Sequence, residues 1–363
     1  MSEQLNKNKI EIIGLMSGTS LDGLDIAHVT FNFKDDEVDF ELINYQTVPY
    51  SSMVLSQLQI ATSLSVPEIL ILDKQIGSFY ANCVNNFIKH YKINKSNITA
   101  IASHGQTIFH QPQNGFTYQI GCGSSLALKT EIDVINNFRE LDVVAGGQGA
   151  PLVPIGDFCL FNKHATSFLN IGGFVNVSYE KNHDIIAYDI CPGNLPLNEI
   201  VKSLGINYDN NGGIARKGKI NFSILEQLQK LEYFHISPPK SLGIEWLEHN
   251  YHPLIKKINL IEDKLRTIIE HIAIEISKTL NEEKIDSVFV TGGGVKNKFL
   301  IERIGHLFNG ELIIPNEEII DYKEAIIFGF LGACYLRNKT NTLKSVTGAV
   351  KDVCSGVFYK SNK

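Results

Sequence analysis

The stretch Ile12-Ile13-Gly14-Leu15-Met16-Ser17-Gly18-Thr19-Ser20-Leu21-Asp22-Gly23-Leu24-Asp25 carries the strongest structural signal in this chain. An apolar run stops at the polar turn 17–20, and a second, β-rich run follows almost at once. This pattern predicts a strand, a tight turn and another strand. Glycine amides and hydroxyls in such a turn can cradle a phosphate, and the carboxylates of Asp22 and Asp25 could hold a hydrated magnesium ion.

Taken alone, the turn could bind a phosphate or could be a hairpin turn without a ligand. A Walker A loop is excluded, because no lysine follows the glycine and no helical pattern follows the turn. A hairpin turn without any ligand remains an alternative, since short glycine motifs often occur without function. Other parts of the chain must decide between the two.

The bulk properties indicate an ordinary globular protein. A length of 363 residues predicts two domains. The net charge of −6 argues against a surface that neutralises nucleic-acid phosphates, although it does not forbid a nucleotide. The six cysteines show no metal or disulfide spacing. Because neither a signal peptide nor a membrane span is apparent, we expect a cytoplasmic protein.

The first half continues with a third strand over 38–45 and a helix over 66–91. A buried strand over 98–103 then ends in His104-Gly105-Gln106-Thr107. Polar residues and glycine after a strand are typical of ligand contacts in open α/β sheets. Residues 130–156 are dense in glycine, proline and charge, so we predict an irregular interdomain crossing or cleft wall there.

The second half repeats this organisation. A strand over 166–171 breaks at Gly172-Gly173, and two further strands over 174–179 and 185–188 lead into Asp189 and a helix. A duplicated β-meander followed by helices predicts two related lobes around one cleft. Later, a helix over 262–280 and a strand over 285–291 are followed by Gly292-Gly293-Gly294 and a helix over 296–308. Three glycines between strand and helix favour close backbone approach to a ligand.

These motifs resemble the sugar kinase, Hsp70 and actin superfamily and, within it, the anhydro-N-acetylmuramic acid kinase family. The matches run in family order from residue 12 to residue 349. They are 14–23, 103–107, Phe138-Arg139 with Asp142, 146–154, 170–173, 238–241, Gly292-Gly293-Gly294 with Asn297, Glu324-Ala325 and 346–349.

The resemblance implies an α/β, two-lobed actin-like ATPase fold, in which duplicated ribonuclease-H-like domains flank a cleft. We place the N-terminal lobe at 1–163 and the C-terminal lobe at 164–363. Enzymes of this family use ATP and Mg²⁺ to open the internal bridge of 1,6-anhydro-N-acetylmuramic acid with water and to phosphorylate O6. The product is N-acetylmuramic acid 6-phosphate, formed in cell-wall recycling. A homodimer is also implied, with no nucleic-acid or membrane partner.

The resemblance also implies roles for individual residues. Asp189 matches the family's catalytic aspartate and is the expected base for water. Arg139 suits the lactyl carboxylate of the sugar through a bidentate contact. The expected nucleotide contacts are Gly18, Thr19, Ser20, Asp22, Gly23, Asp25, Gly172, Gly173, Gly292, Gly293 and Gly294, with Asp22 and Asp25 as magnesium ligands. The other expected sugar contacts are His104, Gln106, Asn194 and Glu324.

Each of these side chains also has a structural interpretation. Asp189 could cap a helix, and His104 could be a neutral histidine that braces its turn. Arg139 could form a structural ion pair with Asp142. Glu324 could be an acid in the first turn of a helix.

The chain departs from the family pattern beside the expected base. Asp189-Ile190-Cys191-Pro192-Gly193-Asn194 stands where the family usually has Asp-Thr-Gly-Pro-Gly-Asn, and Cys191 could be a small buried filler. Leu242-Gly243-Ile244-Glu245 stands for Thr-Gly-Arg-Glu, and Asn198 replaces an acid. We expect these changes on the sugar side. They leave open a related kinase for another anhydro sugar, such as levoglucosan, or for an amino sugar. A non-catalytic sugar sensor is the weaker alternative.

Overall fold

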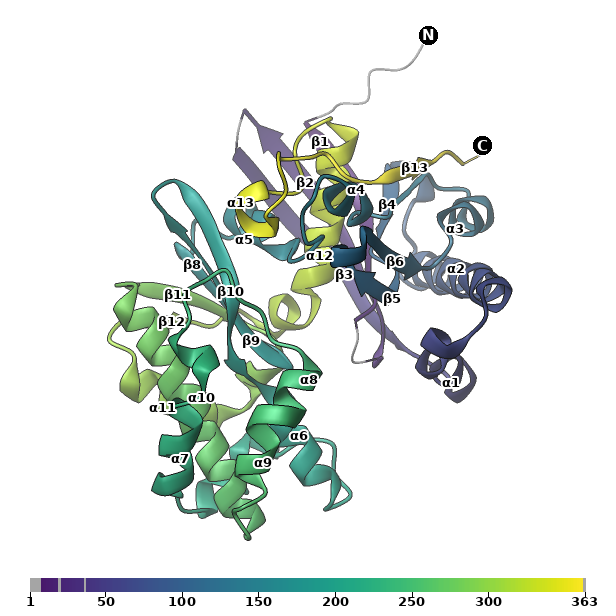
Figure 1. The fold of residues 1–363 in the computed structure, drawn as a ribbon. Coiled ribbons are helices and arrows are strands. Elements are labelled where there is room, and N and C mark those ends of the chain that lie inside the picture. Colours follow the sequence, from purple (N-terminus) through teal and green to yellow (C-terminus); the bar gives the residue numbers. More distant parts are fainter. Residues whose placement is uncertain (1–7, 19–20, 36, 362–363) are drawn as a thin grey trace. The chain divides into compact units, whose positions relative to one another are not determined.

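The computed structural model describes residues 8–18, 21–35 and 37–361. The chain divides into two compact units, coloured by sequence in Figure 1. Unit 1 comprises residues 1–161 together with 322–363, and unit 2 comprises residues 162–321. Each unit is a mixed α/β structure with its own sheet.

The sheet of unit 1 has the strand order β13-β7-β4-β1-β2-β3. Its first three strands form an antiparallel meander, and β4 and β7 extend it in parallel from β1. The strands are β1 (Lys9–Met16), β2 (Gly23–Lys34), β3 (Glu37–Pro49), β4 (Ala100–Ser103), β7 (Val134–Asn136) and β13 (Val357–Tyr359). A separate hairpin consists of β5 (Gln106–Gln111) and β6 (Phe116–Ile120).

The helices of unit 1 cover both faces of this sheet. Because side chains alternate along a strand, Ile13 and Leu15 of β1 share a core with α2, whereas Ile12 and Gly14 face α12. The Glu68 carboxylate accepts from the backbone N–H of Ser65 at 2.8 Å, as in a capping box, at the start of α2. The helices are α1 (Ser52–Gln59), α2 (Val66–His90), α3 (Gly123–Thr130), α4 (Glu140–Val144), α5 (Val153–Leu160), α12 (Glu317–Leu336), which enters unit 1 at Tyr322, and α13 (Lys344–Thr347).

Unit 2 repeats the strand arrangement of unit 1. Its sheet has the order β10-β9-β8-β11-β12, again an antiparallel meander extended by parallel strands. The strands are β8 (Ser167–Ile171), β9 (Phe174–Lys181), β10 (Asp184–Pro192), β11 (Ser287–Thr291) and β12 (Glu311–Ile313). The duplicated meander predicted from the sequence is therefore confirmed.

The helices of unit 2 form one apolar core with its sheet. The longest helix of unit 2 is α10. It buries Leu265, Ile268, Ile272 and Ile276 against Leu169 and other strand residues. The helices are α6 (Asn194–Lys202), α7 (Phe222–Gln229), α8 (Ile244–Trp246), α9 (His252–Ile255), α10 (Ile261–Glu282) and α11 (Lys298–Leu307). Among the described residues, no helix combines the length and the apolar character that crossing a bilayer requires.

Two expectations about chain organisation are corrected. The first boundary, expected after 163, lies after Phe161, but residues 322–363 do not continue the second lobe. They belong to unit 1, where α12 packs on β1 and β13 pairs with β7. The segment 130–156 is also less irregular than predicted, because Val134–Asn136 joins the sheet as β7 and Glu140–Val144 forms α4. Both elements are too short to show the hydrophobic periodicity of a strand or a helix in the sequence.

Candidate active-site residues in the two units

The turn between β1 and β2 is closed by a hydrogen bond from the Leu21 N–H to the Gly18 carbonyl, at 3.2 Å. Leu21 has a left-handed backbone with φ +57°. At Gly23 any Cβ would meet the Val48 carbonyl oxygen at 2.5 Å, so only glycine fits there. Thr19 and Ser20, expected phosphate contacts, lie outside the described residues.

Two carboxylates flank this turn. Asp25 is half-buried on β2, and its Oδ1 accepts a hydrogen bond from Thr47 Oγ1 at 2.6 Å, whereas Asp22 is exposed. Within the described part of the chain, no group of three or more His, Cys, Asp or Glu side chains could hold a metal ion. A pair of carboxylates nevertheless fits Mg²⁺, which usually takes one or two protein carboxylates and completes its shell with water and phosphate oxygens.

His104 follows β4 and is buried beside the turn. Its Nδ1 lies 3.3 Å from the Ser17 carbonyl oxygen, and its Nε2 accepts from Arg139 Nε at 3.0 Å. Burial and the charge of Arg139 lower the pKa of His104 to about 3. His104 is therefore a neutral imidazole with its proton on Nδ1. This geometry supports the alternative in which His104 is a neutral histidine that braces its turn.

Gln106 lies next to the same turn. Its Oε1 accepts a hydrogen bond from the hydroxyl of Ser17, and that hydroxyl also contacts the hydroxyl of Tyr50. Ser17 and Gln106 are both buried. The Ser17–Tyr50 pair was missed from the sequence, because Tyr50 reaches the turn only through the pairing of β2 with β3.

Arg139 does not pair directly with Asp142. Its Nη1 donates to the Gly149 carbonyl at 2.7 Å, and its Nε donates to His104. The Asp142 carboxylate instead accepts from Gly149 N–H and from Thr347 Oγ1, both at 2.7 Å. Among the described residues, Arg139 Nη2 has no hydrogen-bond partner, so the guanidinium keeps donors for a ligand.

Glu324 lies well inside α12, which begins at Glu317, so the first-turn interpretation is wrong. Burial raises the pKa of the Glu324 carboxyl, and the charges of Lys323 and Arg139 oppose that rise. Lys323 itself forms a buried ion pair with Asp157 of α5, at 3.0 Å. The sequence did not predict this pair, because charged residues are expected at the surface unless a partner is known.

In unit 2, Asp189 lies within β10 at a β-bulge, not at the end of the strand as expected. Its Oδ2 accepts from the Leu242 N–H at 2.9 Å, and its backbone carbonyl accepts from Tyr233 Oη at 2.6 Å. Burial raises the pKa of the Asp189 carboxyl, although the Leu242 N–H lowers it in part. The N-cap of α6 is Gly193, so the helix-capping interpretation of Asp189 is wrong.

The two departures directly after Asp189 are buried. Ile190 and Cys191 are both members of the apolar core of unit 2 and almost fully buried. Cys191 is therefore the buried filler that the sequence left as an alternative. Ile244 differs, because it is 54% exposed at the start of α8.

The glycine turns of unit 2 meet around the start of α6. The Asn194 N–H donates to the Gly172 carbonyl at 2.9 Å, and Asn194 Nδ2 donates to the Ile171 carbonyl at 3.3 Å. Gly292 has φ +88°, and a Cβ there would meet the Ile171 carbonyl oxygen at 2.7 Å. A Cβ at Gly293 would meet nothing closer than Asn194 Nδ2, at 3.9 Å. Gly172, Gly293 and Asn194 therefore share one accessible backbone surface, which fits a phosphate or ribose.

Each unit thus gathers its own share of the predicted residues. Unit 1 holds the β1–β2 turn with Asp25, the His104–Arg139 pair, Gln106 and Glu324. Unit 2 holds Asp189 and the glycine turns with Asn194. The repeated strand order, with glycine turns after corresponding strands, defines a two-lobed α/β protein of the actin-like ATPase and sugar kinase class.

Comparison with known proteins identifies the family within this class. The chain belongs to the anhydro-N-acetylmuramic acid kinase family, whose model matches residues 10–361. The anhydro-N-acetylmuramic acid kinase of Francisella tularensis subsp. novicida is 36% identical over 369 residues, which cover 95% of this chain and 97% of that protein. The corresponding kinase of Haemophilus influenzae is 36% identical over 377 residues, with 96% and 97% covered.

Solved structures are more distant. The activator of 2-hydroxyisocaproyl-CoA dehydratase from Clostridium difficile is 14% identical, with a TM-score of 0.45 and 91% and 97% of the chains covered. A ROK family glucokinase from Streptomyces griseus is 8% identical, with a TM-score of 0.39 and 88% and 98% covered.

Proposed function

We propose that this protein is an ATP-dependent kinase that opens 1,6-anhydro-N-acetylmuramic acid with water and phosphorylates O6. The product is N-acetylmuramic acid 6-phosphate. Family membership over residues 10–361 supports the proposal, as do relatives named for this activity. The observation that carries it is the environment of Asp189, a half-buried carboxylate with one oxygen fixed by Leu242 N–H and the other free of that bond.

Asp189 is the proposed general base. Its carboxylate takes a proton from a water molecule as the water oxygen attacks C1 of the sugar, and the bond from C1 to the bridging O6 breaks. The freed O6 then attacks the γ-phosphorus, and the bond between that phosphorus and the bridging oxygen of ATP breaks. A raised pKa suits this role, since a more basic carboxylate accepts a proton from water more readily.

Arg139 and its neighbours are the proposed sugar contacts of unit 1. Nε and one N–H of Nη1 are engaged, so the predicted bidentate contact with a lactyl carboxylate would use Nη2 and the second N–H of Nη1. His104 holds the guanidinium in place instead of contacting the sugar as an acid. Gln106 and Glu324 would bind hydroxyl or amide groups of the sugar, and Asn194 of unit 2 is the remaining proposed contact.

The glycine turns are the proposed nucleotide contacts. In unit 1, Gly18, Gly23 and the neighbouring carboxylates of Asp22 and Asp25 would serve the phosphates and Mg²⁺. Bound Mg²⁺ would neutralise charge on the phosphates. In unit 2, Gly172, Gly173 and the 292–294 turn would approach the nucleotide through their backbone.

A labelling experiment tests the reaction. The purified protein is incubated with ATP, Mg²⁺ and heavy-oxygen water, together with anhydro-N-acetylmuramic acid, levoglucosan or plain N-acetylmuramic acid. The expected product is phosphorylated at O6 and carries the heavy oxygen at C1. Phosphorylation without label at C1 would rule out hydrolytic opening, and preference for levoglucosan would support the related kinase instead. Light scattering of the same sample tests the proposed homodimer.

The role of Asp189 is tested by Asp189→Asn. Loss of a general base is expected to reduce turnover by at least about a hundredfold. ATP binding, measured by calorimetry, should persist because the glycine turns are unchanged. Asp184→Asn, at the exposed start of the same strand, is the matched control and should keep full activity. Full activity in Asp189→Asn would remove this residue from the mechanism.

A further inference from the structure

Cys122 stands apart from the other five cysteines of the chain. Its Sγ lies 2.8 Å from Lys74 Nζ, 3.0 Å from Ser124 Oγ and 3.4 Å from the Ser125 N–H. Burial alone would raise the pKa of the Cys122 thiol, but these hydrogen bonds together lower it below its usual value. The pKa values of Cys83 and Cys159, in contrast, are raised by burial to about 11.

The contact from Lys74 is additional to the helix cap that Cys122 forms. Cys122 is the N-cap of α3, a role that needs only the bond from Ser125 N–H to sulfur. Lys74 extends from α2 to the same sulfur although 61% of its side chain is exposed, and its pKa is raised chiefly by the bond to Cys122. The amine of Lys74 on α2 and the sulfur of Cys122 at the start of α3 are therefore in direct contact, two reactive groups from separate helices.

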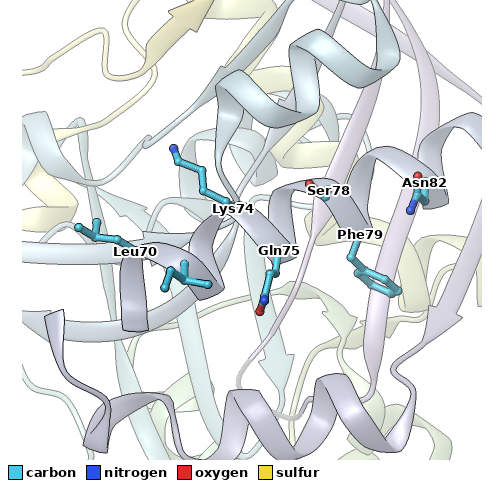
Figure 2. A pocket seen from close by; sticks show the side chains of 7 residues that line it. Leu70, Lys74, Gln75, Ser78, Phe79 and Asn82 are labelled. Carbon is cyan, nitrogen blue, oxygen red and sulfur yellow. The ribbon is translucent and has the colours of Figure 1, made fainter. Parts of the chain in front are cut away.

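The Lys74 side of the pair is open to solvent. Lys74 borders an open hollow of about 590 Å³ along α2, together with Gln75 and Phe79. Figure 2 shows Lys74 extending from α2 on the side opposite to Phe79. Ser124, whose hydroxyl touches the sulfur, is also exposed. Cys122 itself is 7% exposed, so access to the sulfur is along these two side chains.

We propose that Lys74 and Cys122 form an oxidant-dependent covalent cross-link, a sulfenamide, between α2 and the start of α3. The oxidant is a peroxide. The proposal does not rest on the kinase activity, because it concerns two side chains that the proposed reaction does not use.

The cross-link forms in two balanced steps. The Cys122 thiolate attacks one oxygen of hydrogen peroxide, the O–O bond breaks, and hydroxide leaves a sulfenic acid on Cys122. The hydroxide takes a proton from the Lys74 ammonium, which gives water and a neutral amine. The amine nitrogen attacks the sulfenic sulfur, the S–O bond breaks, and a second water leaves with a proton from nitrogen. Sulfur is oxidised by two electrons, and the peroxide is reduced to two molecules of water.

The cross-link would fix the segment that leads from β6 into α3. Gly121, next to Cys122, already donates its N–H to Asp73 Oδ1 at 2.8 Å. Ile120 pairs with Gln106, one of the proposed sugar contacts. A bond between Lys74 and Cys122 therefore tightens the support of the Gln106 strand.

Peptide mass spectrometry tests the proposal. The intact protein is treated with hydrogen peroxide, digested with trypsin without reductant, and compared with a sample treated with dithiothreitol after oxidation. We expect one linked peptide pair that is lighter than the sum of its parts by two hydrogen atoms. It should also lack cleavage after Lys74, and dithiothreitol should restore the separate peptides.

Variants make the assignment specific. Lys74→Arg and Cys122→Ser should abolish the linked pair, whereas Cys354→Ser, a partly exposed thiol of the same unit, should leave it unchanged. In Lys74→Arg, dimedone should trap the sulfenic acid of Cys122. Oxidation of Cys122 in the unmodified sequence to sulfinic acid with Lys74 unlinked, or no faster reaction than at Cys354, would overturn the proposal. The result with the unmodified protein decides the proposal even if a variant does not fold.

Discussion

At the scale of single residues, burial of the Asp189 carboxyl group leads to a prediction about how activity depends on pH. A base must be ionised to accept a proton, and burial raises the pKa of this group above its ordinary value. Activity is therefore lost as the pH falls through the raised pKa. We expect the acidic limb of kcat/KM against pH to lie above the 3.8 of an ordinary aspartate. A profile that stays flat down to that pH would contradict Asp189 as the base, and unfolding measured in parallel by circular dichroism is the control.

Arg139 distinguishes between the candidate sugars. Arg139→Lys removes the Nε bond to His104 and the fork that remains for a carboxylate. Losing a hydrogen bond to a charged group costs about 1.5–3 kcal/mol, so KM for the anhydro-muramyl sugar should rise about ten- to a hundredfold. KM for levoglucosan, which has no carboxylate, should change much less. Equal effects on both sugars would show that Arg139 supports the fold of the site rather than recognising the carboxylate.

The surroundings of Asp189 show what could be predicted for single residues. Asp189 was selected because it matches the family's catalytic aspartate and was expected where the third strand gives way to a turn, although it lies within β10. Its neighbours Ile190 and Cys191 could not be placed, because the bulge in β10 breaks the alternation on which a facing argument depends. Both side chains enter the core, whereas Ile244 is exposed and stays a candidate for altering specificity. The Lys323–Asp157 pair left no sequence signal, since its partners lie on helices far apart in the chain.

At the scale of elements, the packing of α12 on β1 depends on Gly14. A Cβ at Gly14 would overlap the backbone carbonyl of Ala325, which cannot move as a side chain can. Gly14→Ala should therefore lower the free energy of unfolding by at least about 1–3 kcal/mol, the usual cost of overpacking. Chemical denaturation followed by circular dichroism measures the change.

Gly305→Ala is the matched control for this prediction. Gly305 lies within α11, and a Cβ there would meet Leu312 only at 3.9 Å. The substitution should raise the free energy of unfolding by about 0.5–1 kcal/mol, because alanine loses less conformational freedom in a helix. If both substitutions had the same effect, close approach at Gly14 would not be what limits side-chain size.

Long elements were predictable and short ones were not. The periodic pattern over 66–91 corresponds to α2 (Val66–His90), and that over 262–280 to α10 (Ile261–Glu282). By contrast, β7 has three residues, and its place in the sheet depends on parallel pairing with β4, a contact that no local pattern encodes.

At the scale of the whole molecule, the order of the chain and the order of the units differ. Residues 322–363 belong to unit 1, although they follow unit 2 in sequence. The sequence could not show this, because α12 is apolar around most of its circumference and would suit either sheet. Its partners become visible only in the structure, where Phe330 and Phe31 have ring centroids 5.8 Å apart.

This arrangement predicts which fragments fold. Residues 1–161 alone would expose the face of β1 that α12 covers, so they should not unfold cooperatively. Residues 1–161 joined by a flexible Gly/Ser linker to 322–363 restore α12 and β13 and should show one cooperative thermal transition by circular dichroism. Residues 162–321, with their own core, should fold separately and serve as the control. Equal cooperativity of 1–161 with and without the C-terminal segment would mean that α12 is not required for the core of unit 1.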